Sequence, residues 1–372
     1  TYGDVVVVTL NHRLNAFGYC YLASRGFPDS GNAGQLDLIL ALEWVRDNIA
    51  NFGGDPSCVT VFGQSGGGAK IATLMAMPAA AELFHRAFTM SGQQVTASGP
   101  LNAARRTDSY FTALGLTTAH TRELASVPTA RFVEAVQTPD PVLGFGSIYF
   151  GPVLDERHLM RHPFYPDAPS QSNAIPMMIG NTHDETRGFV GADRSLFSLT
   201  WNDVPARLAI AMRVDILPEH VVSEYRRLYS HYSPSDVYFA ASTAARSWRG
   251  ALIELEARAE AGAPAFAYQL DWRAPREGGT FGAPHTLDIP LVFGNLEASE
   301  WIGAASEEAS AMSSTMMEAL LRFARTGNPG WAPYTLPDRA TMMFDNNSLV
   351  QNDPRRAERE LFAKVPYVQP GT

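Results

Sequence analysis

A serine set among glycines, directly after a short apolar stretch, constrains the fold more than any other feature. Residues 59–62 are apolar or β-branched, and Gly63-Gln64-Ser65-Gly66-Gly67 follows them at once. The next residues, 68–75, have a helical pattern. The stretch therefore predicts a strand, a sharp turn and a helix. Glycines are expected on both sides of such a turn because a Cβ there would collide with the tightly folded backbone.

The same turn brings together the parts of a catalytic site. It would raise the Ser65 hydroxyl clear of a sheet and direct the free N–H groups of a helix amino terminus, that of Gly66 among them, toward the same point. A nucleophile and an oxyanion donor would then meet there. A plain glycine-rich connection between a strand and a helix is the alternative that these five residues alone leave open.

Composition and charge narrow the class of protein. The chain has 372 residues, 45% of them apolar and 18% charged, and a net charge of −9. Such a chain can bury a large core, and we expect a single domain over residues 1–372. No basic stripe could replace phosphate counterions, which argues against a nucleic-acid partner. No stretch approaches the roughly 18 uncharged apolar residues that a membrane span needs.

The cysteines point away from disulfides and metals. Cys20 and Cys58 are the only two, and no Cys/His spacing of a zinc site accompanies them. We expect reduced thiols, no metal and no cofactor. Few cysteines and no visible signal peptide slightly favour the cytoplasm, although the true amino terminus is not seen. The sequence does not give the oligomeric state.

Apolar runs alternate with amphipathic segments along the chain. Strands are predicted at residues 4–10, 59–62, 87–90, 176–180 and 265–271, the first buried on both faces. One helix is predicted over 34–52, its core face formed by Leu38, Leu42, Val45, Ile49 and Phe52. A late helix has an apolar face of Ala309, Met312, Met316, Leu320 and Phe323. This alternation predicts a mostly parallel central sheet flanked by helices.

Three segments carry a family resemblance. They are residues 31–37 (Gly-Asn-Ala-Gly-Gln-Leu-Asp), 41–49 (Ala-Leu-Glu-Trp-Val-Arg-Asp-Asn-Ile) and 52–56 (Phe-Gly-Gly-Asp-Pro), which leads into the serine turn. Together they closely resemble the type-B carboxylesterase family, which includes bacterial esterases, carboxylesterases and cholinesterases. The resemblance extends along nearly the whole chain. It implies an α/β-hydrolase fold, with a helical insertion at about 196–262 that walls the active-site gorge.

A serine nucleophile needs a base, and the base needs an orienting acid. In α/β-hydrolases these follow one another as nucleophile, acid and histidine. Ser65, Glu185 and His285 have that order. His285 lies in a Gly/Pro-rich loop before an apolar segment, as the catalytic histidine of the family does. His183 is only two residues from Glu185, so the two side chains could not easily both reach the serine.

The acid and its surroundings depend on the resemblance. Asp184 and Glu185 are adjacent, and their pattern alone does not choose between them. The family uses the glutamate of such a pair, which leaves structural hydrogen bonds to Asp184. Ser91 matches a family serine that supports the acid from behind, although a serine at a strand end is as often a turn former.

The chain also departs from the family. Gly66 stands where alanine is usual, but the donor that is needed is a backbone N–H, which glycine keeps. The family completes its oxyanion hole with a glycine-rich loop, and this chain begins downstream of it. We therefore expect a carboxy-terminal portion of a longer esterase, with the amino-terminal strands missing and catalysis impaired in the isolated chain.

The resemblance implies a serine ester hydrolase that acts on small-molecule esters through an acyl-enzyme. One alternative is a non-catalytic relative, such as the adhesion proteins that share this fold. Those typically lose a member of the triad, whereas this chain keeps all three. Another alternative is an acyltransferase or amidase, because the same acyl-enzyme serves each reaction.

Gln64 generates a prediction about substrate charge. The family usually has glutamate before the nucleophile, and a partly buried charge pair is worth on the order of a kcal/mol or more. Without that negative charge the site attracts a cation less, so we expect neutral esters to be preferred over choline esters. Hydrolysis of butyrylcholine and of a matched neutral ester measures this preference. Comparable turnover of the two would contradict it.

Overall fold

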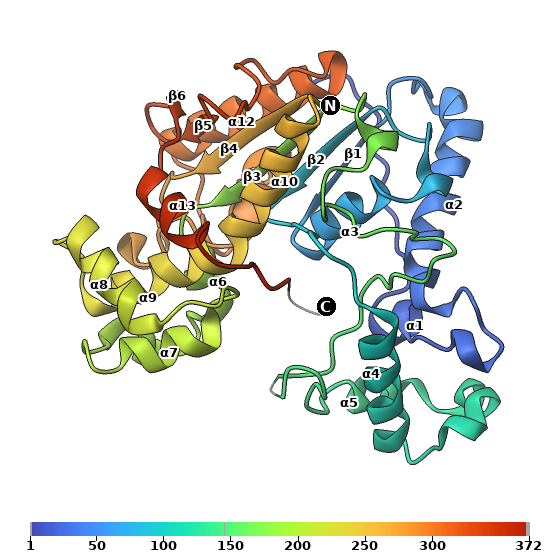
Figure 1. Cartoon of the computed structure of the whole chain (residues 1–372). Coiled ribbons are helices and arrows are strands. Elements are labelled where there is room, and N and C mark those ends of the chain that lie inside the picture. The colour runs from blue at the N-terminus through green and yellow to red at the C-terminus, as the bar shows by residue number, and fades with distance from the viewer. Residues whose placement is uncertain (1, 145, 370–372) are drawn as a thin grey trace.

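The computed structural model describes residues 2–144 and 146–369, and its centre is a twisted six-stranded sheet (Figure 1). The strands lie in sequence order: β1 (Thr60–Gln64), β2 (Arg86–Met90), β3 (Met177–Thr182), β4 (Ala265–Leu270), β5 (Ala340–Phe344) and β6 (Leu349–Asn352). β1 to β5 pair in parallel, and β6 is antiparallel to β5. The carboxyl ends of the five parallel strands therefore meet at one edge, where α/β folds place their ligands.

Helices connect the strands and cover both faces. In chain order they are α1 (Asn15–Tyr19), α2 (Ala33–Asn48), α3 (Gly66–Leu74), α4 (Pro100–Ala113), α5 (Thr129–Ala135), α6 (Glu185–Val190), α7 (Val204–Ala211), α8 (Pro218–Leu228), α9 (Pro234–Thr243), α10 (Arg249–Glu260), α11 (Asp288–Phe293), α12 (Glu307–Thr326) and α13 (Arg356–Phe362). A π-helical turn, Ala244–Trp248, joins α9 to α10.

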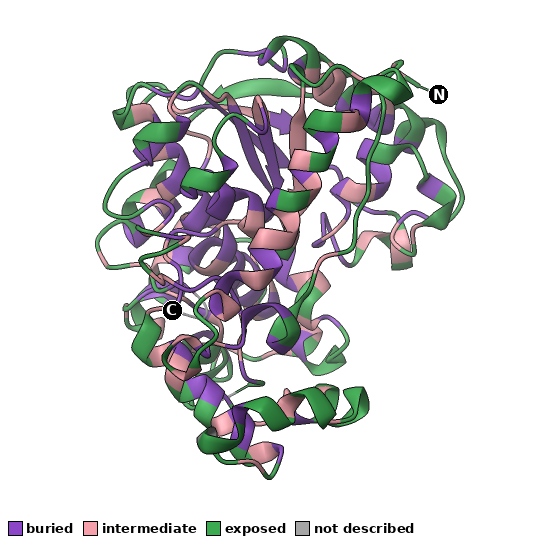
Figure 2. Ribbon diagram, turned by 90° about the vertical axis from the view of Figure 1, so that its right-hand side faces the viewer, coloured by how far each residue is buried: buried purple, intermediate pink, exposed green. Residues whose placement is uncertain are grey.

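Alternation along the strands produces two cores. Ala87 and Ala267 face a core that α2, α3, α9 and α10 complete, whereas Phe88 and Tyr268 face a second core with α11 and α12. Neighbouring residues of one strand point to opposite faces, so each strand contributes to both cores. Figure 2 shows buried residues concentrated along the central strands and exposed residues on the outer helices.

The structure corrects two predictions near the amino terminus. Residues 4–10 form no strand, and Val7 is 52% exposed, because no strand of the described chain lies alongside them to accept hydrogen bonds. The predicted helix 34–52 ends at Asn48 and continues as a 3₁₀ turn, Ile49–Phe52. That turn rotates Phe52 away from the core. The Phe52 side chain is 61% exposed and its ring contacts that of Trp44.

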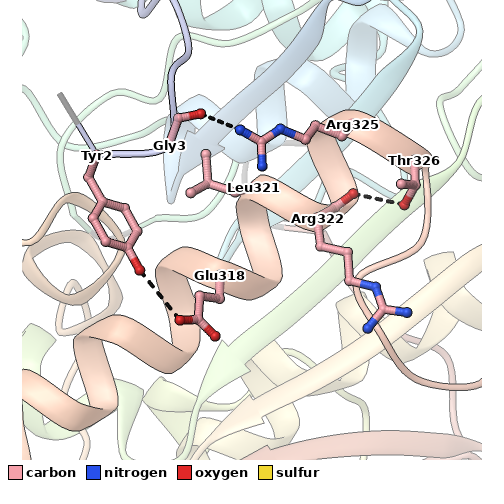
Figure 3. A pocket seen from close by; sticks show the side chains of 7 residues that line it. All are labelled: Tyr2, Gly3, Glu318, Leu321, Arg322, Arg325 and Thr326. Atoms are coloured by element: carbon pink, nitrogen blue, oxygen red, sulfur yellow. Dashed lines mark hydrogen bonds between the residues drawn. The ribbon is translucent and has the colours of Figure 1, made fainter.

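The amino-terminal segment contacts α12 far from the predicted site. Tyr2 Oη donates to Glu318 Oε1 (3.4 Å) and Arg325 donates to the carbonyl of Gly3, around a shallow hollow of about 370 Å³ (Figure 3). Arg86, the first residue of β2, donates to the carbonyl of Arg325. The hollow therefore lies at the amino ends of the strands, opposite to the edge that carries Ser65.

Residues 196–262 are largely helical and are anchored by a buried ionic cluster. Tyr225 and Tyr229 in the region of α8 donate to the Glu358 carboxylate on α13, and Arg355 donates to it with two nitrogens. Arg355 and Glu358 are both buried. The cluster ties this stretch to the carboxy-terminal helix. Its role as a wall of the active site stays a prediction.

The buried cluster predicts a large loss of stability from a small change. Glu358→Gln removes one charge and leaves the Arg355 guanidinium buried without compensation, which typically costs about 3–5 kcal/mol. Urea unfolding should show this loss. Glu360→Gln is the control, because Glu360 is exposed and pairs with the exposed Arg356 on the same helix. Equal unfolding midpoints for the two variants would contradict the importance of the cluster.

Candidate active site

Ser65 occupies a strained turn between β1 and α3. Its backbone has φ 54° and ψ −122°, a region that residues with a Cβ rarely adopt. Its N–H donates to the carbonyl of Met90 at the end of β2 (2.8 Å), which holds the turn against the neighbouring strand. The N–H groups of the first turn of α3, beginning at Gly66, have no acceptor within the helix. They are available to an oxyanion.

Close backbone approaches require glycine at some positions of the turn but not at all of them. A Cβ on Gly63 would lie 2.6 Å from the carbonyl carbon of Gly67, and one on Gly92 would lie 2.1 Å from the carbonyl oxygen of Ser65. A Cβ on Gly67 would meet nothing within 4 Å. The expectation that both pattern glycines are sterically required is therefore wrong for Gly67. Gly92, on the loop after β2, has that role instead.

A short backbone pairing brings the histidine loop to the end of β3. Asp184 N donates to the carbonyl of Ala283 (2.9 Å), and Ala283 N donates to Asp184 Oδ2 (3.0 Å). Arg187 also donates to Asp184. Burial alone would raise the pKa of Asp184. The charge and hydrogen bond of His183, together with the charge of Arg187, outweigh burial and hold this pKa well below its usual range. Asp184 thus makes structural contacts.

Glu185 is fully buried and its two oxygens have different partners. Oε1 accepts from the backbone N–H of Thr182 (3.0 Å) and from the side-chain amide of Asn181 (3.3 Å). Oε2 accepts from His285 Nδ1. The carboxylate is thereby fixed in the geometry that orients an imidazole.

His285 is 7% exposed and carries a perturbed pKa. Burial alone would lower the pKa of His285, but the charge and hydrogen bond of Glu185 outweigh burial and raise it above the usual 6.5. The ring of Phe189 lies against the imidazole, with 4.1 Å between centroids. Because Nδ1 is hydrogen-bonded to Glu185, the other nitrogen, Nε2, is the one that could accept a proton.

The structure brings Glu185 and His285 together but does not bond His285 to the serine. Within the described part of the chain, no hydrogen bond joins Ser65 Oγ to the imidazole. The amide nitrogen of Gln64 lies 3.1 Å from His285 Nε2 instead. Gln64 thus touches the base directly, a contact that sequence reasoning missed.

Two further residues lie near the carboxyl edge of the sheet, Ser91, whose role the sequence left open, and Asp288, which sequence reasoning missed. Ser91 has φ 51° and its N–H donates to the carbonyl of Gly180 (2.7 Å), but its buried hydroxyl has no partner. Its geometry is that of a turn former. Asp288 is fully buried near the site, and Tyr268 Oη donates to it (3.3 Å). Burial, followed by the charge of Glu185, raises the pKa of Asp288 to about 7.

No three His, Cys, Asp or Glu side chains in residues 2–144 and 146–369 lie together as metal ligands would. None of the helices described combines the length and hydropathy of a membrane span.

Substitution of Gly188 tests how closely the position of His285 depends on its packing against α6. A Cβ at this position of α6 would lie 2.7 Å from His285 N and 3.0 Å from its Cβ, so Gly188→Ala should push the imidazole away from Glu185. The pKa of His285 should then fall toward 6.5 or below, as an NMR titration of the imidazole measures. Gly67→Ala, in open space, is the control. An imidazole pKa unchanged by Gly188→Ala would contradict this view.

Comparisons with known proteins identify the family of the chain. The sequence profile of the Carboxylesterase family matches residues 1–362. The para-nitrobenzyl esterase of Bacillus subtilis (strain 168) is 33% identical over 96% of this chain and 73% of its own length. Human carboxylesterase 3 is 30% identical over 88% of this chain, which spans 60% of that relative. The crystal structure of carboxylesterase EST55 from Geobacillus stearothermophilus matches with a TM-score of 0.84 and 32% identity, over 97% of this chain and 76% of that one.

The family profile covers nearly the whole chain, and the three proteins named above are 30–33% identical to it. The chain therefore belongs to the carboxylesterase family of serine ester hydrolases and has the α/β-hydrolase fold.

Proposed function

We propose that Ser65 is the nucleophile, His285 the general base and Glu185 the orienting acid, and that the substrates are neutral small-molecule esters. The observation that carries this proposal is the contact of His285 Nδ1 with the buried Glu185, at the sheet edge where the strained turn presents Ser65. The para-nitrobenzyl esterase relative is named for a neutral aromatic ester group, which supports the same substrate class.

The reaction proceeds in two steps. Ser65 Oγ attacks the ester carbonyl while its proton passes to His285 Nε2, and the N–H of Gly66 donates to the oxyanion that forms. The imidazolium then protonates the leaving alcohol, which leaves an acyl group on Ser65. Water attacks this acyl-enzyme with His285 again as base, and the acid is released. Glu185 keeps Nδ1 protonated and stabilises the imidazolium throughout.

Gln64 occupies the nitrogen of His285 that has to act as the base. Its amide N–H donates to the same Nε2 lone pair that must receive the serine proton. The amide has to leave that nitrogen before Ser65 can be activated. As a neutral side chain, Gln64 places no charge beside the reacting carbonyl, which agrees with a preference for uncharged esters.

A fluorophosphonate probe tests the assignment of the nucleophile. Such probes phosphonylate a serine only when a base activates it, so we expect the label on the peptide that contains Ser65. Ser65→Ala and His285→Gln should abolish labelling, and Ser91→Ala should keep it, because Ser91 has the geometry of a turn former. A label on another serine, or equal labelling of Ser65→Ala, would disprove the proposal.

The raised pKa of His285 sets the pH dependence. Only the neutral imidazole accepts a proton, so kcat/KM should rise with pH, with a midpoint above 6.5. Glu185→Gln removes the charge that favours the imidazolium, so the midpoint should fall and the rate with it. Initial rates with a neutral nitrophenyl ester between pH 5 and 9 measure both. A rate independent of pH across that range would exclude His285 as the base.

A further inference from the structure

Arg246 is a cation close to the candidate site. It lies in the π-helical turn Ala244–Trp248, and its guanidinium carbon is 5.0 Å from the centroid of the Phe189 ring. The Phe189 centroid is in turn 4.1 Å from that of His285. The guanidinium carbon is therefore no further from the imidazole than the sum of these two distances. The ring of Phe189 contacts both groups and is 39% exposed.

Nothing in the described residues neutralises this cation. Among the described residues, the guanidinium of Arg246 makes no ion pair or hydrogen bond. It makes a cation–π contact with the ring of Phe189. Its neighbours differ: Arg187 on α6 pairs with Asp184 and Asp236, and Arg249 on α10 pairs with Glu256. Arg187 and Arg249 are thus paired with carboxylates, whereas Arg246 forms no ion pair within the described residues.

A second arginine lies near Arg246. Burial, followed by the charge of Arg246, lowers the pKa of Arg213, which places a second cation nearby. Glu254 is the first acidic residue after Arg246 in the sequence, but it is fully buried and burial raises its pKa to about 8. It is therefore mostly protonated at neutral pH and offers little negative charge.

The backbone of the π-helical turn is held in place. Tyr367 Oη donates to the carbonyl of Arg246 (2.9 Å), and Trp248 packs under the guanidinium of Arg355. A π-helical turn inserts one residue into a helix and changes the direction of the side chains that follow, and such turns are frequent at functional sites. Here the anchored turn fixes the origin of a long side chain whose charged end has no partner.

We propose that Arg246 binds a carboxylate carried by the substrate, so that the enzyme accepts anionic aromatic esters in addition to neutral ones. A guanidinium presents a planar fork that matches a carboxylate, and it is the usual residue for such recognition. The exposed ring of Phe189 supplies a stacking surface for an aromatic spacer between the ester and the carboxylate. This inference rests on the proposed function, because it places the reacting ester at Ser65 and His285.

Matched substrates test the inference on the purified protein. Two anionic probes are 4-acetoxybenzoate, with the carboxylate in the leaving group, and monomethyl terephthalate, with the carboxylate in the acyl group. Their neutral partners are the corresponding benzamides. In at least one pair, Arg246→Gln should lower the ratio of kcat/KM for anion over amide about tenfold, and Arg246→Lys should retain part of that ratio. Raised salt should reduce the ratio in the wild type and in Arg246→Lys but not in Arg246→Gln.

A control variant and a binding measurement keep the outcomes distinct. Arg249→Gln removes a paired arginine three residues away and should leave both ratios unchanged. Calorimetry with 4-hydroxybenzoate, a product of the first probe, should show binding that Arg246→Gln loses. Ratios and binding that are the same in Arg246→Gln and the wild type would overturn the inference. Binding that depends on Arg246 in a protein that hydrolyses no ester would overturn the proposed function and keep the carboxylate site.

Discussion

The pairing of Asp184 with Ala283 is the contact on which the site depends. The hydrogen bonds of this pair join two segments 99 residues apart in the chain. Glu185 directly follows Asp184, and His285 is two residues after Ala283. The close approach also requires the absence of a side chain at Gly282, where a Cβ would lie 2.1 Å from Asp184 Oδ2. Asp184 thus positions the segment that carries Glu185 against the loop that carries His285.

Local pattern was sufficient for much of the fold and for the outline of the site. The strands that carry the site are short apolar runs bounded by turn residues. The glycines around Ser65 predict the sharp turn that follows the first of them. The choice of Glu185 over Asp184 required the family resemblance. The two carboxylates have different contacts in the structure: Asp184 is engaged with the backbone of Ala283 and with Arg187, whereas Glu185 contacts His285.

Other features could not be predicted because they depend on partners distant in the sequence. Residues 4–10 are apolar enough for a strand, but a strand also needs a neighbour, and the described chain supplies none beside them. The contact of Phe189 with His285 depends on how α6 meets the loop before α11. The place of Arg246 depends on the extra residue of a π-helical turn, which helical periodicity does not reveal.

Asp288 makes the stability of the fold and the protonation of His285 respond to rising pH in opposite ways for catalysis. Its pKa is about 7 in the folded chain and near 3.8 when exposed, so a proton on this carboxyl favours folding at low pH, and that contribution is lost as pH rises through about 7. The same rise converts His285 to the neutral form that a base requires. A rise in pH therefore increases the fraction of neutral His285 and lowers the free energy of unfolding that Asp288 contributes. The best working pH is a compromise between catalytic rate and the lifetime of the folded protein.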